Sequence, residues 1–268
     1  TGMPLVLSAV APGGVVTIGY SPIAPGGFGE YVLLSEQLLM EAPAELRPEV
    51  VATTEPLAVG LHAVRRGRVQ PGESVLIMGA GPVGLMTLLW LRAEGIEDVA
   101  VSDPSPERRA LARRVGASLV LDPRTDDIRS ALAEAFAGQF RGRDEPGAAF
   151  GAGPGGPAPD VVFECVGVAG TIQEAMSYAQ VRGRVVVVGV CMGEDRLQPA
   201  AGIMKELSLE FVLGYTGQEY QESLDALAAG TVDTTPLISR VVTLDELPEA
   251  FRSLSDPREC KVIVRHAS

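Results

Sequence analysis

The chain has 268 residues, a formal net charge of −12 at pH 7 and 46% apolar residues. An acidic chain is a poor ligand for a phosphate backbone, so we expect no nucleic-acid partner. The charged fraction of 21% is ordinary for a folded globular protein and excludes a disordered chain. The length allows one whole domain and part of a second.

Three cysteines and two histidines are scattered along the chain. Their spacing forms neither a local zinc motif nor a disulfide framework, which indicates a reducing, cytoplasmic setting. No apolar run is long enough to cross a membrane. The first basic residue is Arg47, so the apolar N-terminal stretch lacks the basic segment of an export signal. We therefore expect neither membrane insertion nor export.

The first 55 residues are rich in Gly, Pro and β-branched residues. They predict short strands over 15–18 and 31–34, on either side of a turn at 25–27. A helix is predicted next, over 55–68, because Pro56 suits a first helical position and apolar residues recur at helical spacing.

From residue 74 the pattern changes to short apolar runs that alternate with helical segments. The predicted strands are 74–78, 99–102, 118–121, 161–165, 184–188 and 209–213, and the predicted helices are 82–93, 106–115, 126–137 and 170–180. Strands that are apolar throughout, with helices between them, predict a parallel sheet covered on both faces. Six such strands predict an α/β fold with a doubly wound parallel sheet.

Two regions depart from this rhythm. Half of residues 138–159 are Gly or Pro, which predicts a flexible surface insertion. After residue 230 the pattern gives strands over 237–243 and 260–264 and a helix over 245–254. We therefore predict a nucleotide-binding domain over 56–230, inserted into a second domain made of 1–55 and 231–268.

A glycine-rich turn joins the first of these strands to its helix. Gly79, Gly81 and Gly84 form the pattern G-x-G-x-x-G in the strand–turn–helix context that gives it meaning. Gly79 permits a tight turn, Gly81 lets the backbone approach a pyrophosphate, and Gly84 lets the helix pack closely on the strand. The pattern predicts a Rossmann-type site with free helix amides facing the phosphates.

An acidic residue, Asp103, ends the second strand about 20 residues past the last glycine. A carboxylate there can accept hydrogen bonds from the adenosine ribose and would repel a 2′-phosphate, which favours NAD over NADP. Two alternatives compete with this interpretation: a bare glycine turn with Asp103 as a helix cap, and a methyltransferase, which also uses a glycine-rich loop and an acid. The flanking second domain argues against the methyltransferase.

Several stretches in order resemble one known family: residues 26–31 (GGFGEY), 55–64 (EPLAVGLHAV), 71–84 (PGESVLIMGAGPVG), 160–167 (DVVFECVG) and the tail 237–264. The family is the zinc-containing medium-chain alcohol dehydrogenases, in particular the polyol, butanediol and threonine dehydrogenase branch. The resemblance implies that residues 1–55 and 231–268 are parts of a mainly β, GroES-like catalytic domain. Zinc-independent quinone reductases of the same superfamily usually carry a different turn, AAGGVG.

The resemblance implies roles for eleven cofactor-binding residues. Those expected at the pyrophosphate, the adenosine ribose and the adenine are Gly79, Gly81, Pro82, Val83, Gly84, Asp103 and Arg108. Those expected around the nicotinamide and its ribose are Cys165, Val166, Gly189 and Val190.

The resemblance also places Glu55 at the catalytic zinc, although an acid at a helix start is equally a common capping residue. The family's other catalytic ligands are a Cys and a His-Glu pair in its N-terminal half. This chain has no cysteine before Cys165 and no histidine before His62. Because a catalytic zinc normally needs three protein ligands, the zinc site is predicted to be incomplete. The chain is then either part of a longer dehydrogenase or a natural short form.

The function implied by the resemblance is hydride transfer between a secondary alcohol or polyol and NAD. We expect the chain to bind NAD(H) and to have little zinc-dependent activity. Two alternatives stay open: a zinc-independent, quinone-reductase-like enzyme, and a non-catalytic nucleotide-binding remnant. The family commonly forms homo-oligomers through the edge strand of the nucleotide domain, for which 209–213 is the candidate.

Overall fold

The computed structural model describes residues 8–11, 14–17, 19, 26–29, 31–32, 34, 36, 39–137 and 158–266. The chain divides into two compact units: Val59–Leu213, and a second unit of Thr1–Ala58 with Gly214–Ser268. Of the predicted insertion, residues 138–157 lie outside the described residues. Its last two residues lead directly into a buried strand.

The unit Val59–Leu213 is built on one six-stranded parallel sheet, in the order β5-β4-β3-β6-β7-β8. The strands are β3 (Val75–Met78), β4 (Val99–Ser102), β5 (Leu119–Leu121), β6 (Val161–Glu164), β7 (Arg184–Val187) and β8 (Ser208–Phe211). In chain order this is 3-2-1-4-5-6, the doubly wound order of dinucleotide-binding domains. The predicted fold class is confirmed, and the strand order reverses between β3 and β6.

Helices cover both faces of this sheet. They are α2 (Thr54–Gly67, which begins in the other unit), α3 (Pro82–Ala93), α4 (Pro106–Arg114), α5 (Ile128–Ala135), α7 (Thr171–Tyr178) and α8 (Pro199–Lys205). Leu76, Val162 and Val185 form one apolar cluster with side chains of α5 and α7. Alternate residues point to the opposite face, where Phe163 and Val186 approach the end of α2. All four residues of β3, β4 and β6 are buried, which explains their unbroken apolar character.

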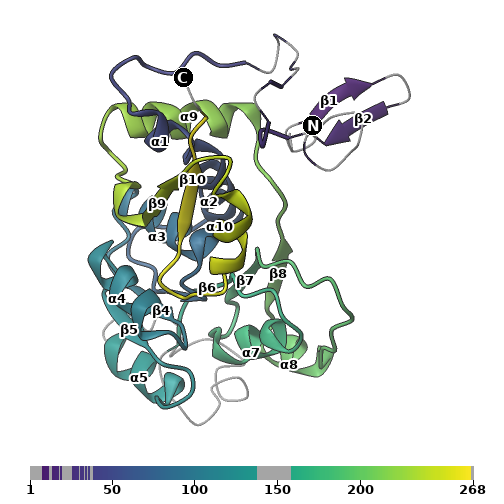
Figure 1. Cartoon of the computed structure of the whole chain (residues 1–268). Coiled ribbons are helices and arrows are strands. Elements are labelled where there is room, and N and C mark those ends of the chain that lie inside the picture. The colour runs from purple at the N-terminus through teal and green to yellow at the C-terminus, as the bar shows by residue number, and fades with distance from the viewer. Residues whose placement is uncertain are drawn as a thin grey trace. The chain divides into compact units, whose positions relative to one another are not determined.

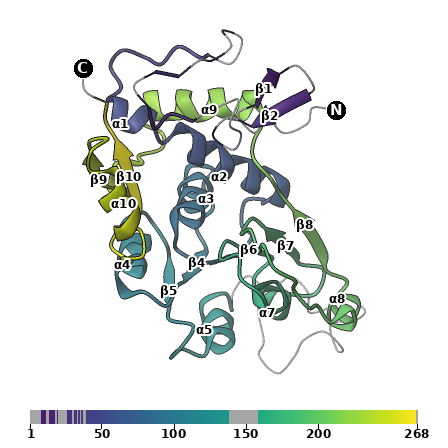
Figure 2. The same cartoon turned by 45° about the vertical axis from the view of Figure 1, so that its right-hand side comes forward.

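One edge of the sheet is formed by strand β8. Helices α7 and α8 lie side by side in both views, near the edge strand β8 (Figures 1 and 2). Among the described strands, β8 pairs only with β7, and it is the least buried strand of the sheet. Helix α8 was not predicted from the sequence.

The other unit contains two small strand pairs and several helices. Strand β1 (Ser8–Ala11) pairs antiparallel with β2 (Gly14–Thr17), and β9 (Ile238–Val242) pairs in parallel with β10 (Lys261–Val264). The helices are α1 (Pro48–Val51), α9 (Gly217–Ala228) and α10 (Leu247–Ser253), together with a 3₁₀ turn at Thr235–Leu237. In both views β9, β10 and α10 are grouped together (Figures 1 and 2). The strands predicted over 237–243 and 260–264 are confirmed to within two residues.

Two predictions need correction. The predicted nucleotide domain extended to residue 230, whereas the sheet-containing unit ends at Leu213 and α9 belongs to the other unit. The reason is a capping box at Thr216 and Glu219, which starts a helix that contacts α1. The strand predicted over 31–34 is absent at Tyr31, Val32 and Leu34, and residue 33 lies outside the described part.

Among the described residues, no helix combines the length and the apolar character needed to cross a membrane.

Helices α2 and α3 pack closely enough to require glycine at one position. A Cβ atom on Gly60 would lie 2.7 Å from the carbonyl carbon and 2.8 Å from the oxygen of Met86, both backbone atoms. Backbone cannot move aside as a flexible side chain can, so the helices would have to separate. This contact holds α2 against the helix that follows the glycine turn.

Replacing this glycine tests the close packing. Gly60→Ala is expected to lower the free energy of unfolding by about 1–3 kcal/mol, because the added methyl group overpacks the interface. Urea unfolding followed by circular dichroism measures the effect. Gly193→Ala is the matched control, since nothing lies within 4 Å of a Cβ at that position. Equal effects of the two substitutions would contradict the assigned contact.

Candidate functional site: a pocket at the carboxyl ends of the strands

A pocket opens at the carboxyl ends of β3, β4 and β6, beside the point where the strand order reverses. Open α/β sheets bind their ligands at such a switch point. Six of the predicted cofactor residues line it: Gly79, Gly81, Asp103, Arg108, Cys165 and Val166. The other five are not among its lining residues: Pro82, Val83 and Gly84 form the first turn of α3, and Gly189 and Val190 lie two and three residues after the end of β7.

The glycine turn after β3 has the backbone geometry that its sequence predicted. Gly79 has φ +93°, a conformation that favours glycine, and its amide donates to the oxygen of Ser102 at 2.8 Å. A Cβ on Gly84 would collide with the oxygen of Gly79 and lie 3.2 Å from the side chain of Ile77. The two glycines therefore let α3 start directly over the end of the strand.

The start of α3 faces open space. Gly81 precedes the helix, and nothing lies within 4 Å of a Cβ placed on it. The first amide bonded to the helix backbone is that of Leu85, which donates to the oxygen of Gly81 at 3.0 Å. The amides before it have no acceptor in the preceding turn, as at every helix start. Together with the helix dipole they form a site for an anionic group such as a pyrophosphate.

Asp103 is 3% exposed and joins two backbone segments at the pocket. Its Oδ2 accepts from the amide of Ala80 at 2.8 Å, and its Oδ1 accepts from the amide of Ser105 at 2.8 Å. A carboxylate offers about four lone-pair positions, so this one retains capacity for a ligand hydroxyl. It therefore holds the glycine turn and presents negative charge to the pocket at the same time.

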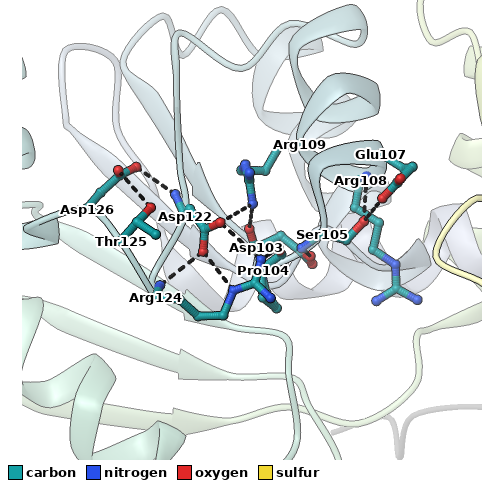
Figure 3. A network of polar contacts seen from close by, with 10 residues as sticks. All are labelled: Asp103, Pro104, Ser105, Glu107, Arg108, Arg109, Asp122, Arg124, Thr125 and Asp126. Carbon is teal, nitrogen blue, oxygen red and sulfur yellow. Dashed lines mark hydrogen bonds and ion pairs between the residues drawn. The ribbon is translucent and has the colours of Figure 1, made fainter.

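A network of arginines and acids extends from Asp103 to the end of β5 (Figure 3). Arg109 donates to the backbone oxygen of Asp103 at 2.7 Å and pairs with Asp122 at 3.0 Å. Arg124 pairs with Asp122 at 3.1 Å and also donates to the oxygen of Pro104. In Figure 3 the guanidinium of Arg108 points away from these pairs, and Arg108 is a pocket residue.

The hydrogen bonds from Arg124 lower the pKa of Asp122 to about 2, and the charge of Arg109 contributes less. A lowered pKa means that the charged pair stabilises the folded protein above the ordinary pKa of about 3.9 and that this contribution disappears as the pH falls towards 2.

The variant Asp122→Asn should therefore melt at a lower temperature than the unmodified chain at about pH 6, and the difference should vanish near pH 2. Thermal unfolding across this pH range measures it. Arg124→Gln removes the main partner and should reduce the same pH dependence. A difference that is constant with pH would contradict the role of the carboxylate charge.

The segment after β6, which contributes Cys165 and Val166 to the pocket, approaches the segment after β7. A Cβ on Gly167 would lie 2.6 Å from the amide nitrogen of Val190. Val166 and Val190 are 44% and 68% exposed, so both apolar side chains are available to a ligand. Burial raises the pKa of the Cys165 thiol well above its ordinary value, which keeps it neutral.

Glu55 lies in the first turn of α2, in the unit that contains the two small strand pairs. Burial raises the pKa of its carboxyl group, and the charge of Lys261 partly offsets this. Two tyrosines of the same unit are near it: burial, and then the charge of Glu55, raise the pKa of both Tyr215 and Tyr220. The two rings are 5.7 Å apart between centroids.

Comparison with known proteins identifies the family of this chain. A family model described as "Zinc-binding dehydrogenase" matches residues 82–229, more than half of the chain. The (R,R)-butanediol dehydrogenase of Bacillus subtilis is 30% identical over 242 residues, which are 90% of this chain and 64% of the relative. The sorbitol dehydrogenase of Homo sapiens is 30% identical over 223 residues, or 83% of this chain and 58% of the relative. The chain belongs to the zinc-binding dehydrogenase family.

A solved structure supports the same assignment. A putative zinc-binding dehydrogenase from Sinorhizobium meliloti, bound to NADP, superposes with a TM-score of 0.77 at 29% identity, covering 95% of this chain and 77% of that one. The resemblance seen in the sequence motifs is confirmed at the level of the family. The chain spans about three fifths of the length of the two curated relatives.

The described part of the chain contains no set of side chains that could bind the zinc of this family. Among those residues, no three His, Cys, Asp or Glu side chains form a cluster that could hold a metal ion. Glu55 has Tyr215 and Tyr220 as neighbours, and phenols buried at raised pKa are poor zinc ligands. The described residues therefore supply no complete zinc site, whereas the pocket and the helix start fit a nicotinamide dinucleotide.

Several residues of the site were not predicted from the sequence. Thr171, Glu174 and Tyr178 come from α7 and line the pocket. Their i, i+3, i+7 spacing places them on one helix face, but nothing local shows that this face meets the glycine turn. Outside this pocket, in the unit that contains Glu55, Tyr215 was also not predicted; it lies two residues past the predicted sixth strand.

The hydroxyl of Tyr215 is buried and has no hydrogen-bond partner among the residues that the structure describes. An unsatisfied buried hydroxyl costs about 1–3 kcal/mol. Tyr215→Phe is therefore expected to raise the free energy of unfolding by about 1 kcal/mol. Chemical denaturation measures it, with Tyr220→Phe as the matched control. A clear loss of stability in Tyr215→Phe would show that the hydroxyl has a partner.

Proposed function

We propose that this chain binds NAD(H) and forms part of an oxidoreductase that transfers hydride between a small secondary alcohol or polyol and the nicotinamide. The observation that carries the proposal is the pocket at the switch point, where the Gly79–Gly84 turn meets the buried carboxylate of Asp103. Family membership supports the reaction class, and the relatives named for butanediol and sorbitol support the substrate class.

The adenosine half of the cofactor would lie between the glycine turn and the end of β4. The amides at the start of α3 would bind the pyrophosphate, with Gly79, Gly81, Pro82, Val83 and Gly84 as the binding segment. Asp103 would accept a hydroxyl of the adenosine ribose, and its charge would repel the 2′-phosphate of NADP. Arg108 would lie beside the adenine, where a guanidinium can stack on an aromatic ring.

The nicotinamide half would lie against the segments that follow β6 and β7. Cys165 and Val166 would form one wall of this subsite, and Gly189 and Val190 the other. The exposed valine side chains supply apolar surface that excludes water from the ring. The bound cofactor supplies the hydride chemistry, while the protein orients the ring between these two segments.

Glu55 remains our candidate for the acidic ligand at a catalytic zinc. One carboxylate does not complete a catalytic ligand set, so the proposed transfer relies on no zinc-dependent step. Alcohol oxidation that persists in the presence of a chelator would favour the zinc-independent, quinone-reductase-like alternative. NADH binding without any oxidoreductase activity would favour a nucleotide-binding remnant.

We further propose that the chain forms a homo-oligomer through the edge strand β8. Phe211 and Leu213 are 63% and 64% exposed there, and an open apolar edge favours pairing with another strand. A cytoplasmic setting is proposed because the three cysteines are all free, as expected in a reducing compartment.

Calorimetric titration with NADH and with NADPH tests the cofactor assignment. We expect the chain to bind NADH about tenfold more tightly than NADPH, equivalent to roughly 1.4 kcal/mol. Asp103→Asn should weaken NADH binding and reduce this preference, because the repulsive charge is removed. Asp98→Asn, at the other end of the same sheet, is the matched control. No heat with millimolar NADH would overturn the proposal, and equal binding of both cofactors would overturn only the NAD preference.

A further inference from the structure

A second buried carboxylate lies at the end of β6. Glu164 is 1% exposed, and its Oε1 accepts from the amide of Val166 at 2.7 Å and from the amide of Gly167 at 2.8 Å. The hydroxyl of Thr171, at the start of α7, lies 3.0 Å from the same oxygen and 2.7 Å from the backbone oxygen of Val168, so its single proton is shared between these two acceptors. One carboxylate oxygen therefore fixes the backbone of the segment between β6 and α7.

The backbone of Glu164 binds the neighbouring segment as well. Its carbonyl oxygen accepts from the amides of Val188 and Gly189, both at 2.9 Å. The residue therefore ties together two chain segments that are joined by a helix and a strand. These are the two segments that form the proposed nicotinamide subsite.

The two segments pack backbone against backbone around this side chain. A Cβ on Gly189 would lie 2.7 Å from the Cα of Gly167 and 2.8 Å from the Oε2 of Glu164. Gly167 has φ +73°, which favours glycine. The carboxylate therefore fills the space beside Gly189 and leaves little room for another position of either segment.

The buried carboxylate restricts movement of the segment after β6. Burying a carboxylate is costly unless hydrogen bonds compensate it, and bonds from backbone amides to a charged oxygen are among the stronger ones. Moving Val166 or Gly167 away would leave the charge uncompensated in a buried place. The position of the segment is therefore held more rigidly than its exposed side chains suggest.

We propose that Glu164 is a positioning residue for the nicotinamide half of the cofactor: it holds the segment after β6 against the segment after β7, so that Val166 and Val190 form a fixed seat for the ring. This inference rests on the proposed function. The adenosine half is held by a different carboxylate, Asp103, which bonds Ala80 and Ser105. The two halves of the cofactor should therefore respond differently to changes at Glu164.

Binding of NADH and of ADP to the full chain separates the two halves, because ADP lacks the nicotinamide and its ribose. In Glu164→Gln, NADH affinity is expected to fall about tenfold while ADP affinity stays within about twofold, because a neutral amide bonds the two backbone donors less strongly. If NADH fluorescence increases when the cofactor binds the unmodified chain, the increase should be smaller in Glu164→Gln, since the ring is less well held.

The matched control is Glu73→Gln. Glu73 is a partly buried carboxylate at the amino end of the same sheet, where it pairs with Arg184. Its substitution should change stability without changing the ratio of NADH to ADP affinity. A general loss of stability therefore cannot mimic the expected result.

Thr171→Val and hydrogen exchange provide an independent test if Glu164→Gln folds poorly. Removing only the hydroxyl donor should weaken NADH about twofold to threefold and leave ADP unchanged. Exchange at the amides of Val166 and Gly167 should be faster in either variant, with no change at Ala80. Equal weakening of NADH and ADP, or no effect on NADH, would overturn the positioning role. Failure of the unmodified chain to bind NADH would instead overturn the proposed function.

Discussion

The two hydrogen bonds that Asp103 accepts from the amides of Ala80 and Ser105 organise the pocket. They fix the glycine turn after β3 against the end of β4 and place a buried negative charge between them. Because that charge is 3% exposed, the fold depends on keeping both amides in position. The same contact also shapes the proposed ribose subsite, so Asp103 both stabilises the fold and takes part in binding the ligand.

A similar arrangement recurs at the end of β6. Glu164 accepts from two backbone amides and a hydroxyl, and so links the segment after β6 to α7. Each carboxylate stands at the carboxyl end of a buried strand and is compensated mainly by backbone donors. Backbone donors cannot change rotamer, so they hold a segment more firmly than side-chain donors would. This explains how a pocket made of loops can present a fixed geometry to a long dinucleotide.

Much of the sheet-containing unit was predicted from local patterns. Helix α3 and strand β4 have the predicted bounds, because the glycine turn before α3 and the apolar run of β4 define them within a few residues. Helix α8 was missed because it is short and its residues are exposed or only partly buried. Helix α9 was missed although Thr216 and Glu219 form a capping box, a signal that is present in the sequence.

The sequence by itself determined the doubly wound fold, the glycine turn and the acid at the end of β4, since each depends on residues close together in the chain. Only the tertiary structure showed that Gly167 meets the backbone after β7 and that the carbonyl oxygen of Glu164 accepts from the amides of Val188 and Gly189. It also showed that α9 belongs to the other unit and not to the sheet-containing one. These contacts join residues whose separation is set by how strands align and helices pack, and no local pattern encodes that alignment.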